Sequence, residues 1–272
     1  MAADRAGARD GVLLVDKPAG KSSHDIVAAV RRGLGSRRVG HAGTLDPFAT
    51  GLLLVLVGRA TRIQRYLMAL PKSYETVARL GATSTTGDTE GEITPTGRLP
   101  PDPPLLATGD LLQRPPAYSA VKVDGRRAYK RARAGEQVEL AARPVTVHRF
   151  EQLWRAGDRA AFAIDCSAGT YVRALIADLG DAYCEQLRRT AIGPFAVEDA
   201  DPARLVGLAD ALSFMPAVAL DADAARRAGH GQAVEAQAPA GADAVLLVDA
   251  DGPIAVAEPR GDALKPVVGF RA

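Results

Sequence analysis

The chain has 272 residues, of which 47% are hydrophobic and 24% are charged, a balance typical of a globular protein large enough for two domains. No apolar run approaches the length of a transmembrane helix, and the polar segment 1–10 lacks the apolar stretch of a secretory signal. We therefore expect a loose N-terminal tail and no membrane association. The two cysteines, at 166 and 184, form no pattern, which favours a reducing, cytoplasmic setting.

Charge is unevenly distributed along the chain. Residues 201–272 carry a net charge of −4, so residues 1–200 carry +6. Arginine pairs or clusters occur at 31–32, 37–38, 126–133 and 188–189. This asymmetry favours an anionic partner for the first 200 residues, and a solvated basic surface is an equal alternative.

The first third of the chain predicts a compact alternation of strands and helices. Residues 11–17 have the pattern of a short buried strand. Ser22 or Ser23 is expected to cap a helix that runs to about Arg32 and ends at Gly33 and Gly35. We also expect a central strand, a helix and an alternating strand, over 52–58, 60–70 and 72–82.

The middle of the chain is rich in Gly, Pro, Thr and Asp over 83–117, which predicts loops. Order is expected to resume with a strand over 117–123 and, after an Asp-Gly turn, a basic helix over 126–135. Further on, we expect strands over 138–154 and 160–167 and a helix over 169–181.

The last segment, 217–272, is predicted to be a small β-rich domain. It contains a strong hairpin signal over 244–258, where an Asp-Gly turn separates two apolar runs, and a third strand over 264–270. With 1–10 as a tail and 11–216 as the main domain, the fold class is α/β (α+β), with a mixed, largely antiparallel sheet flanked by helices.

Several kinds of chemistry lack a motif in this sequence. The four histidines and two cysteines show no metal-ligand spacing, and there is neither a P-loop nor a dinucleotide-binding glycine pattern. There is also no nucleophile elbow around a serine. We therefore expect an activity without metal or cofactor.

The segment GHAGTLDPFATG (40–51) places one carboxylate, Asp46, in a conformationally restricted loop. Pro47 limits the backbone of Asp46, while Gly43 and Gly51 permit unusual torsions or the close approach of another chain. Such a loop can present a carboxylate to a ligand in a fixed geometry. The alternative is that Asp46 merely begins a turn, as most Asp-Pro pairs do.

Five sequence segments in a fixed order favour a functional role for Asp46 over a simple turn. They are GVLLVDKPAGKSSHDIV with GHAGTLDPFATGLLLVLVGRATR, KSYETVARLGATSTTGDTEG, QRPPAYSAVKVDGRRAYKRARAG, CSAGTYVRALIADLG and LRRTAIGPF. Together they resemble the bacterial tRNA pseudouridine-55 synthase family, of the TruB type. The resemblance covers residues 11–200, and the last segment resembles the RNA-binding PUA-like tail of that family more weakly.

The resemblance implies a pseudouridine synthase fold and an isomerase that converts the T-loop uridine at tRNA position 55 to pseudouridine after base flipping. It implies three catalytic residues. Asp46 matches the nucleophile, which attacks either ribose C1′ or base C6; Tyr74 matches the tyrosine that stacks on the flipped base; and Arg173 matches the arginine that pairs with the aspartate.

The resemblance also implies substrate-binding positions. His41 matches a histidine beside the flipped nucleotide, Tyr171 a substrate contact, and Leu187 an apolar contact near the base. Lys17 matches the lysine of the first motif, which we expect to support the site through structure. The arginine-rich segments 31–38 and 126–133 are expected to contact phosphates.

Two departures from the family pattern concern the loops. The segment DAYCEQ before LRRT is about five residues shorter than usual, which puts the place of Leu187 in question, and the stretch 95–116 is also short. The alternatives to a tRNA isomerase are an RNA-binding or RNA-folding protein without catalysis and a guide-dependent synthase of the H/ACA type. We expect a monomer that binds tRNA without guide RNA. Whether the C-terminal tail touches tRNA or acts as a stabilising cap stays open.

Overall fold

The computed structural model describes residues 10–116 and 140–271 and, between them, residues 118, 119, 122, 123, 125–128, 131 and 136. The predicted basic helix therefore lies largely outside the described residues, as do Lys130 and Arg133. Its first two residues, Arg126–Arg127, form strand β9, which pairs with β8 (Lys122–Val123). The predicted helix start at residue 126 was wrong, because Arg126 and Arg127 pair as a strand with Val123 and Lys122.

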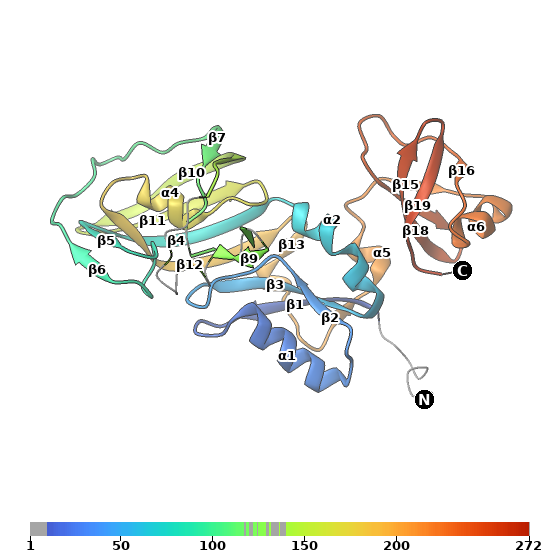
Figure 1. The fold of residues 1–272 in the computed structure, drawn as a ribbon, viewed down its shortest axis with the longest axis horizontal. Coiled ribbons are helices and arrows are strands. Elements are labelled where there is room, and N and C mark those ends of the chain that lie inside the picture. The colour runs from blue at the N-terminus through green and yellow to red at the C-terminus, as the bar shows by residue number, and fades with distance from the viewer. Residues whose placement is uncertain are drawn as a thin grey trace.

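A ten-stranded sheet forms the larger part of the molecule (Figure 1). Its main path runs β14-β1-β3-β12-β4-β11-β10-β7, with β2 beside β3 and β13 beside β12. In that order the strands are Leu205–Val206, Gly11–Lys17, Thr50–Val57, Ala182–Ile192, Lys72–Leu80, Arg159–Cys166, Arg143–Ala156 and Gly109–Gln113, with β2 at Val39–Ala42 and β13 at Phe195–Ala196. Among the described strands of this sheet, β3 and β12 pair in parallel and the other pairs are antiparallel, which confirms the predicted fold class.

The predicted first helix is α1 (Ser23–Leu34). Ser22 caps it: the backbone N–H of Asp25 donates to Oγ of Ser22, and the backbone N–H of Ser22 donates to Oδ2 of Asp25, which completes a capping box. Gly33 lies inside the helix, and Gly35 alone ends it in the left-handed conformation, with φ of 60°. The helix packs its apolar side, with Val27 buried, against β1 and β3.

Two further predictions needed correction. The helix expected over 60–70 begins as a 3-10 helix, η1 (Gly58–Ile63), and continues as α2 (Gln64–Ala69). The stretch expected to be loops contains strands β5 (Ala82–Ser84) and β6 (Ile93–Pro95), which form a hairpin, besides β7. Threonine and isoleucine suit such a hairpin, and their strand preference was masked by the surrounding glycines and prolines.

The remaining helices of the described chain are short. They are α4 (Val172–Ala177), η2 (Val197–Asp199), α5 (Leu208–Ala211) and α6 (Ala222–Gly229). Helix α4 is shorter than the predicted 169–181 and packs Leu175 and Ile176 against the core side of the large sheet. Cys166 and Cys184 are buried and free.

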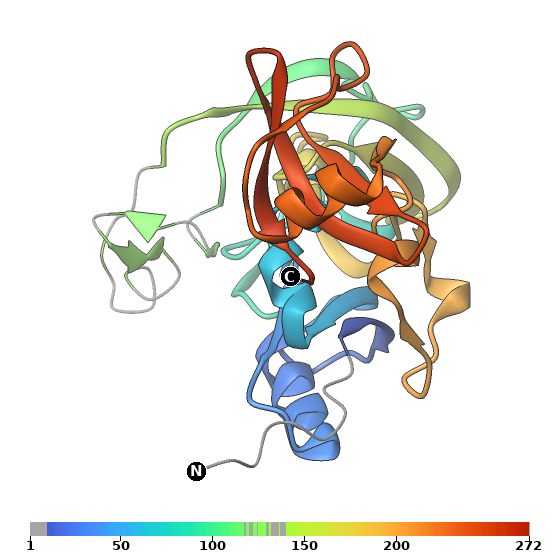
Figure 2. The ribbon, with the colours of Figure 1, turned by 90° about the vertical axis from the view of Figure 1, so that its right-hand side faces the viewer.

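The C-terminal segment forms a second sheet of five strands in the order β15-β17-β18-β19-β16. The strands are Ala217–Ala219, Val245–Asp249, Gly252–Arg260, Ala263–Gly269 and Val234–Glu235. The predicted hairpin and third strand are confirmed, and α6 lies on the face of this sheet (Figure 2). The arrangement is consistent with a PUA-like domain.

One apolar cluster joins the two sheets. Ile63 and Leu67, from η1 and α2, are buried in the same cluster as Val256 and Phe270 of the C-terminal segment. Polar contacts reinforce the junction, since Arg62 donates to the carbonyl of Gly269 at 2.8 Å. The C-terminal sheet is thereby fixed beside α2 (Figure 1). Among the described residues, no helix is long and apolar enough to cross a membrane.

Candidate active site

The loop that carries Asp46 connects β2 to β3 and is held from both sides. Leu45, next to Asp46, is buried, and its backbone N–H donates to Oγ of Ser23 at 2.9 Å. The carbonyl of Pro47 accepts bonds from the backbone of Gly20 at 2.8 Å and from Nζ of Lys17 at 3.2 Å. The backbone on both sides of Asp46 is therefore fixed, as the sequence suggested.

Lys17 lies wholly inside the protein. Its Nζ donates to the carbonyls of Pro18 at 2.9 Å, Lys21 at 2.7 Å and Pro47 at 3.2 Å. Burial lowers the pKa of Lys17, and the charge of Asp46 acts against that shift. With no exposed surface, Lys17 supports the loop and does not line the cavity.

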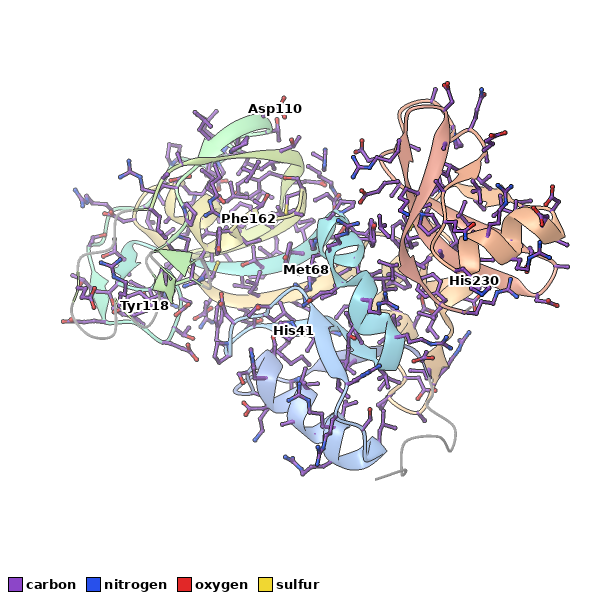
Figure 3. The ribbon with its side chains drawn as sticks, turned by 45° about the vertical axis from the view of Figure 1, so that its right-hand side comes forward. His41, Met68, Asp110, Tyr118, Phe162 and His230 are labelled. Carbon is purple, nitrogen blue, oxygen red and sulfur yellow. The ribbon has the colours of Figure 1, made fainter. Side chains whose placement is uncertain are left out.

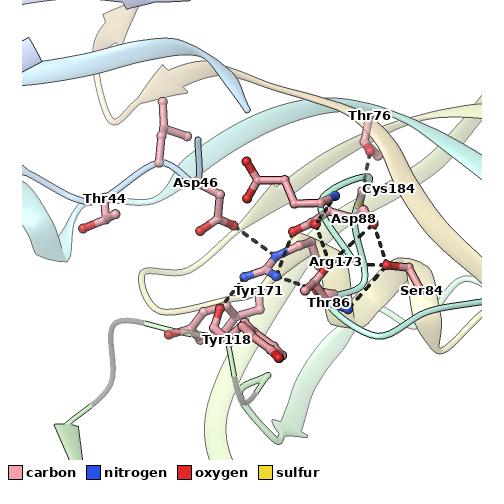
Figure 4. Close-up of polar contacts among 12 residues, drawn as sticks. Thr44, Asp46, Thr76, Ser84, Thr86, Asp88, Tyr118, Tyr171, Arg173 and Cys184 are labelled. Atoms are coloured by element: carbon pink, nitrogen blue, oxygen red, sulfur yellow. Dashed lines mark hydrogen bonds and ion pairs between the residues drawn. The ribbon is translucent and has the colours of Figure 1, made fainter. Parts of the chain in front are cut away.

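Arg173 is the centre of the polar network (Figure 4). Although it belongs to α4, only 4% of its side chain is exposed, and its Nε lies 3.0 Å from Oδ2 of Asp46. The structure thus brings together the aspartate and the arginine that the sequence paired. Its Nη1 also donates to the carbonyl of Thr86 at 2.6 Å, and its Nη2 to that of Tyr118 at 2.8 Å.

The structure adds a second carboxylate, Asp88, which the sequence analysis missed. Its Oδ2 lies 3.0 Å from Nη1 of Arg173, and its side chain is 3% exposed. Its Oδ1 accepts bonds from Oγ1 of Thr86 at 2.5 Å and from the backbone of Glu90 at 2.9 Å. Arg173 therefore joins Asp46 to a carboxylate that is itself fully hydrogen-bonded.

A cavity of about 730 Å³ opens at this network. Its lining includes His24, Asp46, Asp88, Glu90, Tyr118 and Arg173. The side chain of Asp46 is 35% exposed toward it. Burial raises the pKa of Asp46, and the guanidinium of Arg173 opposes that shift. A cavity of this size, with Asp46 as a partly exposed carboxylate paired with Arg173, suits one covalent or acid-base step on a bound ligand.

Tyr74 and Tyr171 are near enough to Asp46 for its charge to act on their phenols. Tyr74, on β4, is half-buried, and burial raises the pKa of its phenol while Arg189 opposes the shift. Tyr171 precedes α4, and its backbone is held by Gln113, which accepts from its N–H at 2.7 Å and donates to its carbonyl at 3.1 Å. Burial raises the pKa of Tyr171 as well. The charge of Asp46 acts on both phenols, so the two tyrosines belong to the same electrostatic environment.

His41 lies on β2, in the larger part of the molecule (Figure 3). Its ring meets that of His24 edge-on, with centroids 5.5 Å apart. Its backbone carbonyl accepts a bond from Nε2 of Gln64 at 2.7 Å. His24 lines the cavity, so His41 is connected to the site through that ring contact.

The structure does not bring Leu187 to this cavity. Leu187 lies on β12 opposite Thr76 and is 7% exposed. It lines a separate hollow of about 610 Å³ together with Phe48 and Trp154. Strand β12 continues as a paired strand through the segment where the family was expected to have a longer connection, and the contact of Leu187 with the base stays a prediction.

The arginine pair at 188–189 was misread as part of a basic surface. Arg188 forms an ion pair with Asp16 at 2.7 Å, and Arg189 is 2% exposed. Arg32, Arg37 and Arg38 are exposed, and the ion pairs among the described residues include none of them. Among the described residues, the segment 31–38 therefore best fits the arginine-rich surface that was predicted to contact phosphates.

The arrangement can be compared with known proteins. The family model "TruB family pseudouridylate synthase (N terminal domain)" matches residues 31–172. A protein of Thermobifida fusca (strain YX), "tRNA pseudouridine synthase B", is 47% identical, with 96% of this chain and 98% of that protein aligned. A protein of Nocardia farcinica (strain IFM 10152) with the same name is 49% identical over 80% of this chain and 74% of its own length.

Solved structures agree with this comparison. "Crystal Structure of a Cbf5-Nop10-Gar1 Complex" contains a chain that superposes with a TM-score of 0.73 at 25% identity, covering 96% of this chain and 84% of that one. A chain of "Crystal structure of the archaeal box H/ACA sRNP Nop10-Cbf5 complex" shares the fold, with a TM-score of 0.72 at 23% identity. The chain therefore belongs to the TruB family of pseudouridylate synthases.

Proposed function

We propose that this protein is a tRNA pseudouridine synthase that isomerises the T-loop uridine at tRNA position 55. The observation that carries the proposal is the partly exposed carboxylate of Asp46, which lines a polar cavity and pairs with the buried Arg173 at 3.0 Å. Membership of a pseudouridylate synthase family makes the protein an isomerase. The names of its relatives, at 40–49% identity, support tRNA as the substrate.

The chemistry needs only groups that this chain supplies. The bond from ribose C1′ to N1 of uracil breaks and a bond from C1′ to C5 forms, while C5 loses a proton and N1 gains one. Nothing is oxidised or reduced, so the reaction balances without a cofactor. Asp46 acts as the nucleophile, at C1′ or at C6, and Arg173 keeps the carboxylate ionised and oriented for attack.

The target base reaches Asp46 only after it leaves the stack of the folded T-loop, which costs a few kcal/mol. Tyr74 stacks on the flipped base, Tyr171 contacts it, and His41 occupies the space that the base leaves. These three roles come from the family resemblance. The contact of His41 with His24, which lines the cavity, and the action of the Asp46 charge on both tyrosines support them.

Binding of tRNA is assigned to the basic surface of 31–38. Its exposed arginines neutralise phosphates and give affinity without base specificity. We propose that the protein acts as a monomer without guide RNA. Two proteins of similar fold come from complexes with further chains, and the sequence relatives carry the name of a tRNA enzyme instead.

The test uses a tRNA transcript labelled with tritium at C5 of its uridines, without metal or guide RNA. The parent protein is compared with Asp46→Asn. Asp16→Asn makes the same chemical change at an exposed carboxylate outside the cavity and serves as the control. We expect release from the parent and the control and none from Asp46→Asn, which should still bind tRNA. A silent parent that binds tRNA would identify an RNA-binding protein, and release only after guide RNA is added would identify a guide-dependent enzyme.

A further inference from the structure

Arg189 is a buried cation that makes no contact with substrate in the proposed mechanism. It is among the largest fully buried side chains of the described residues. Its Nε donates to the carbonyl of Leu52 at 2.8 Å, and its Nη2 to that of Gly43 at 3.1 Å. Leu52 follows the Asp46 loop and Gly43 begins it, so one guanidinium fixes both ends of that loop.

The backbone of Arg189 is fixed as tightly as its side chain. Gly51 adopts a φ of +99°, and a Cβ at that position would lie 2.2 Å from the carbonyl oxygen of Arg189. The close approach brings β3 and β12 together where the loop ends. This packing holds the backbone of Arg189 against Gly51, and the residue is 2% exposed.

Arg189 also differs from its neighbour in how its charge is balanced. Arg188 pairs with Asp16, and the ion pairs among residues 10–116 and 140–271 give Arg189 no carboxylate partner. Burying a charge is costly unless it is compensated, and here carbonyl dipoles provide the compensation. An unpaired buried cation acts strongly on nearby titratable groups, because little water screens it.

Tyr74 is the residue placed to feel that charge. It lies directly across from Arg189 in the pairing of β4 with β12. The charged or titratable groups with the largest effect on its phenol are Arg189 from β12, Cys166 from β11 and Asp46 from the loop. Of these three, Arg189 alone carries positive charge.

We infer that Arg189 is a positioning residue of the site: its guanidinium fixes the loop that carries Asp46 and sets a positive charge against the phenol of Tyr74. The inference rests on the proposed function, since it assigns Arg189 to the reaction through Asp46 and Tyr74. Both roles can be measured without an activity assay. The positioning role is read from amide hydrogen exchange in the Asp46 loop, and the electrostatic role from the pKa of residue 74.

The test replaces Tyr74 by a fluorinated tyrosine whose phenol ionises near neutral pH, and follows its ¹⁹F resonance against pH. In R189Q the loss of positive charge disfavours the phenolate, so the pKa should rise by about 1 unit or more. R188Q, on the same strand but paired with Asp16, should leave the pKa unchanged. Equal pKa values in the parent and a folded R189Q would overturn the electrostatic role.

A second variant keeps the inference testable if R189Q does not fold. R189K retains the charge and loses the planar fork that reaches the carbonyls of Gly43 and Leu52. Its pKa at residue 74 should stay near that of the parent, while amide hydrogen exchange of residues 43–46 should become faster. Unchanged exchange would overturn the positioning role. Tritium release by the parent, measured in parallel, separates a failure of this inference from a failure of the proposed function.

Discussion

Asp88 and Arg173 form an ion pair with both partners buried: Oδ2 and Nη1 are 3.0 Å apart, and the side chains are 3% and 4% exposed. Arg173 thus pairs with both Asp88 and Asp46, and the charge of Asp88 raises the pKa of Asp46. Removing one partner of such a pair leaves an uncompensated charge in the interior.

Asp88→Ala should lower the free energy of unfolding by about 3 kcal/mol or more, as expected for a broken buried pair. Asp16→Ala breaks the exposed pair with Arg188 and should cost less than about 1 kcal/mol. Urea unfolding of both variants gives the comparison. Similar losses for the two would show that Asp88 contributes no more than a surface charge.

Arg173→Gln should move the acidic limb of the rate profile to higher pH. The guanidinium is the strongest influence that lowers the pKa of Asp46, so its removal raises that pKa and the reactive carboxylate forms only at higher pH. The rate should also fall by about 100-fold, because the carboxylate loses its orienting partner. Single-turnover tritium release against pH is the measurement. Arg173→Lys, which keeps the charge, should lose rate with a smaller displacement of the limb, and an unmoved limb in Arg173→Gln would contradict the pairing.

Because the pKa of Lys72 is lowered in the native protein, the free energy of unfolding should increase with pH. Burial lowers its pKa to about 8, so between pH 8 and the ordinary lysine range the unfolded chain binds a proton that the native protein lacks. From pH 7 to pH 9 the free energy of unfolding should rise by about 1 kcal/mol from this residue. Urea unfolding at the two pH values should show the gain in the parent and in the exposed control Lys21→Met, but not in Lys72→Met. A gain of the same size in Lys72→Met would assign it to other groups.

The basic surface predicts a steep dependence of tRNA affinity on salt. Replacing Arg37 and Arg38 by alanine should weaken binding and reduce the slope of log Kd against log salt by about 2, one for each lost phosphate contact. Arg188→Ala is the matched control, since its partner is Asp16. Filter binding at several salt concentrations measures the slopes, and a flat response in the parent would rule out phosphate contacts as the source of affinity.

Gly51→Ala should cost far more stability than Gly20→Ala. Both glycines have positive φ, which strains an alanine by about 1 kcal/mol. A Cβ on Gly20 meets nothing within 4 Å, whereas one on Gly51 meets the backbone of Arg189 at 2.2 Å. The difference in unfolding free energy between the two variants isolates the clash. Equal costs would mean that β3 and β12 can separate without penalty.

Much of the fold followed from local patterns. The apolar run of β3, the Ser22 cap of α1 and the hairpin of β17 and β18 are set by residues close together in the chain, and each was predictable. Strand β12 was not expected, because its arginine pair indicated exposure. In a strand, successive side chains point to opposite faces, and which face is buried depends on partners distant in sequence.

The residues of the site also fall into those that the sequence predicted and those that depend on distant packing. Asp46 and Arg173 were found through motifs of a known family, and their ion pair follows from the fold. Asp88 lies in a glycine- and threonine-rich stretch that indicated a loop, with no local sign that its carboxylate would be buried. Only the packing of the 84–90 turn against α4, where Gly87 lies against Cβ of Arg173, brings Asp88 to its partner.

The apolar cluster shared by η1, α2 and the C-terminal sheet has a consequence for how the chain can be divided. Ile63, Leu67, Val256 and Phe270 are buried in one cluster to which both sheets contribute. A cut near residue 216, where the sequence predicts a domain boundary, would therefore separate side chains that pack in one cluster. A truncated chain that ends there would carry a solvent-exposed apolar face on α2 and would be prone to aggregate.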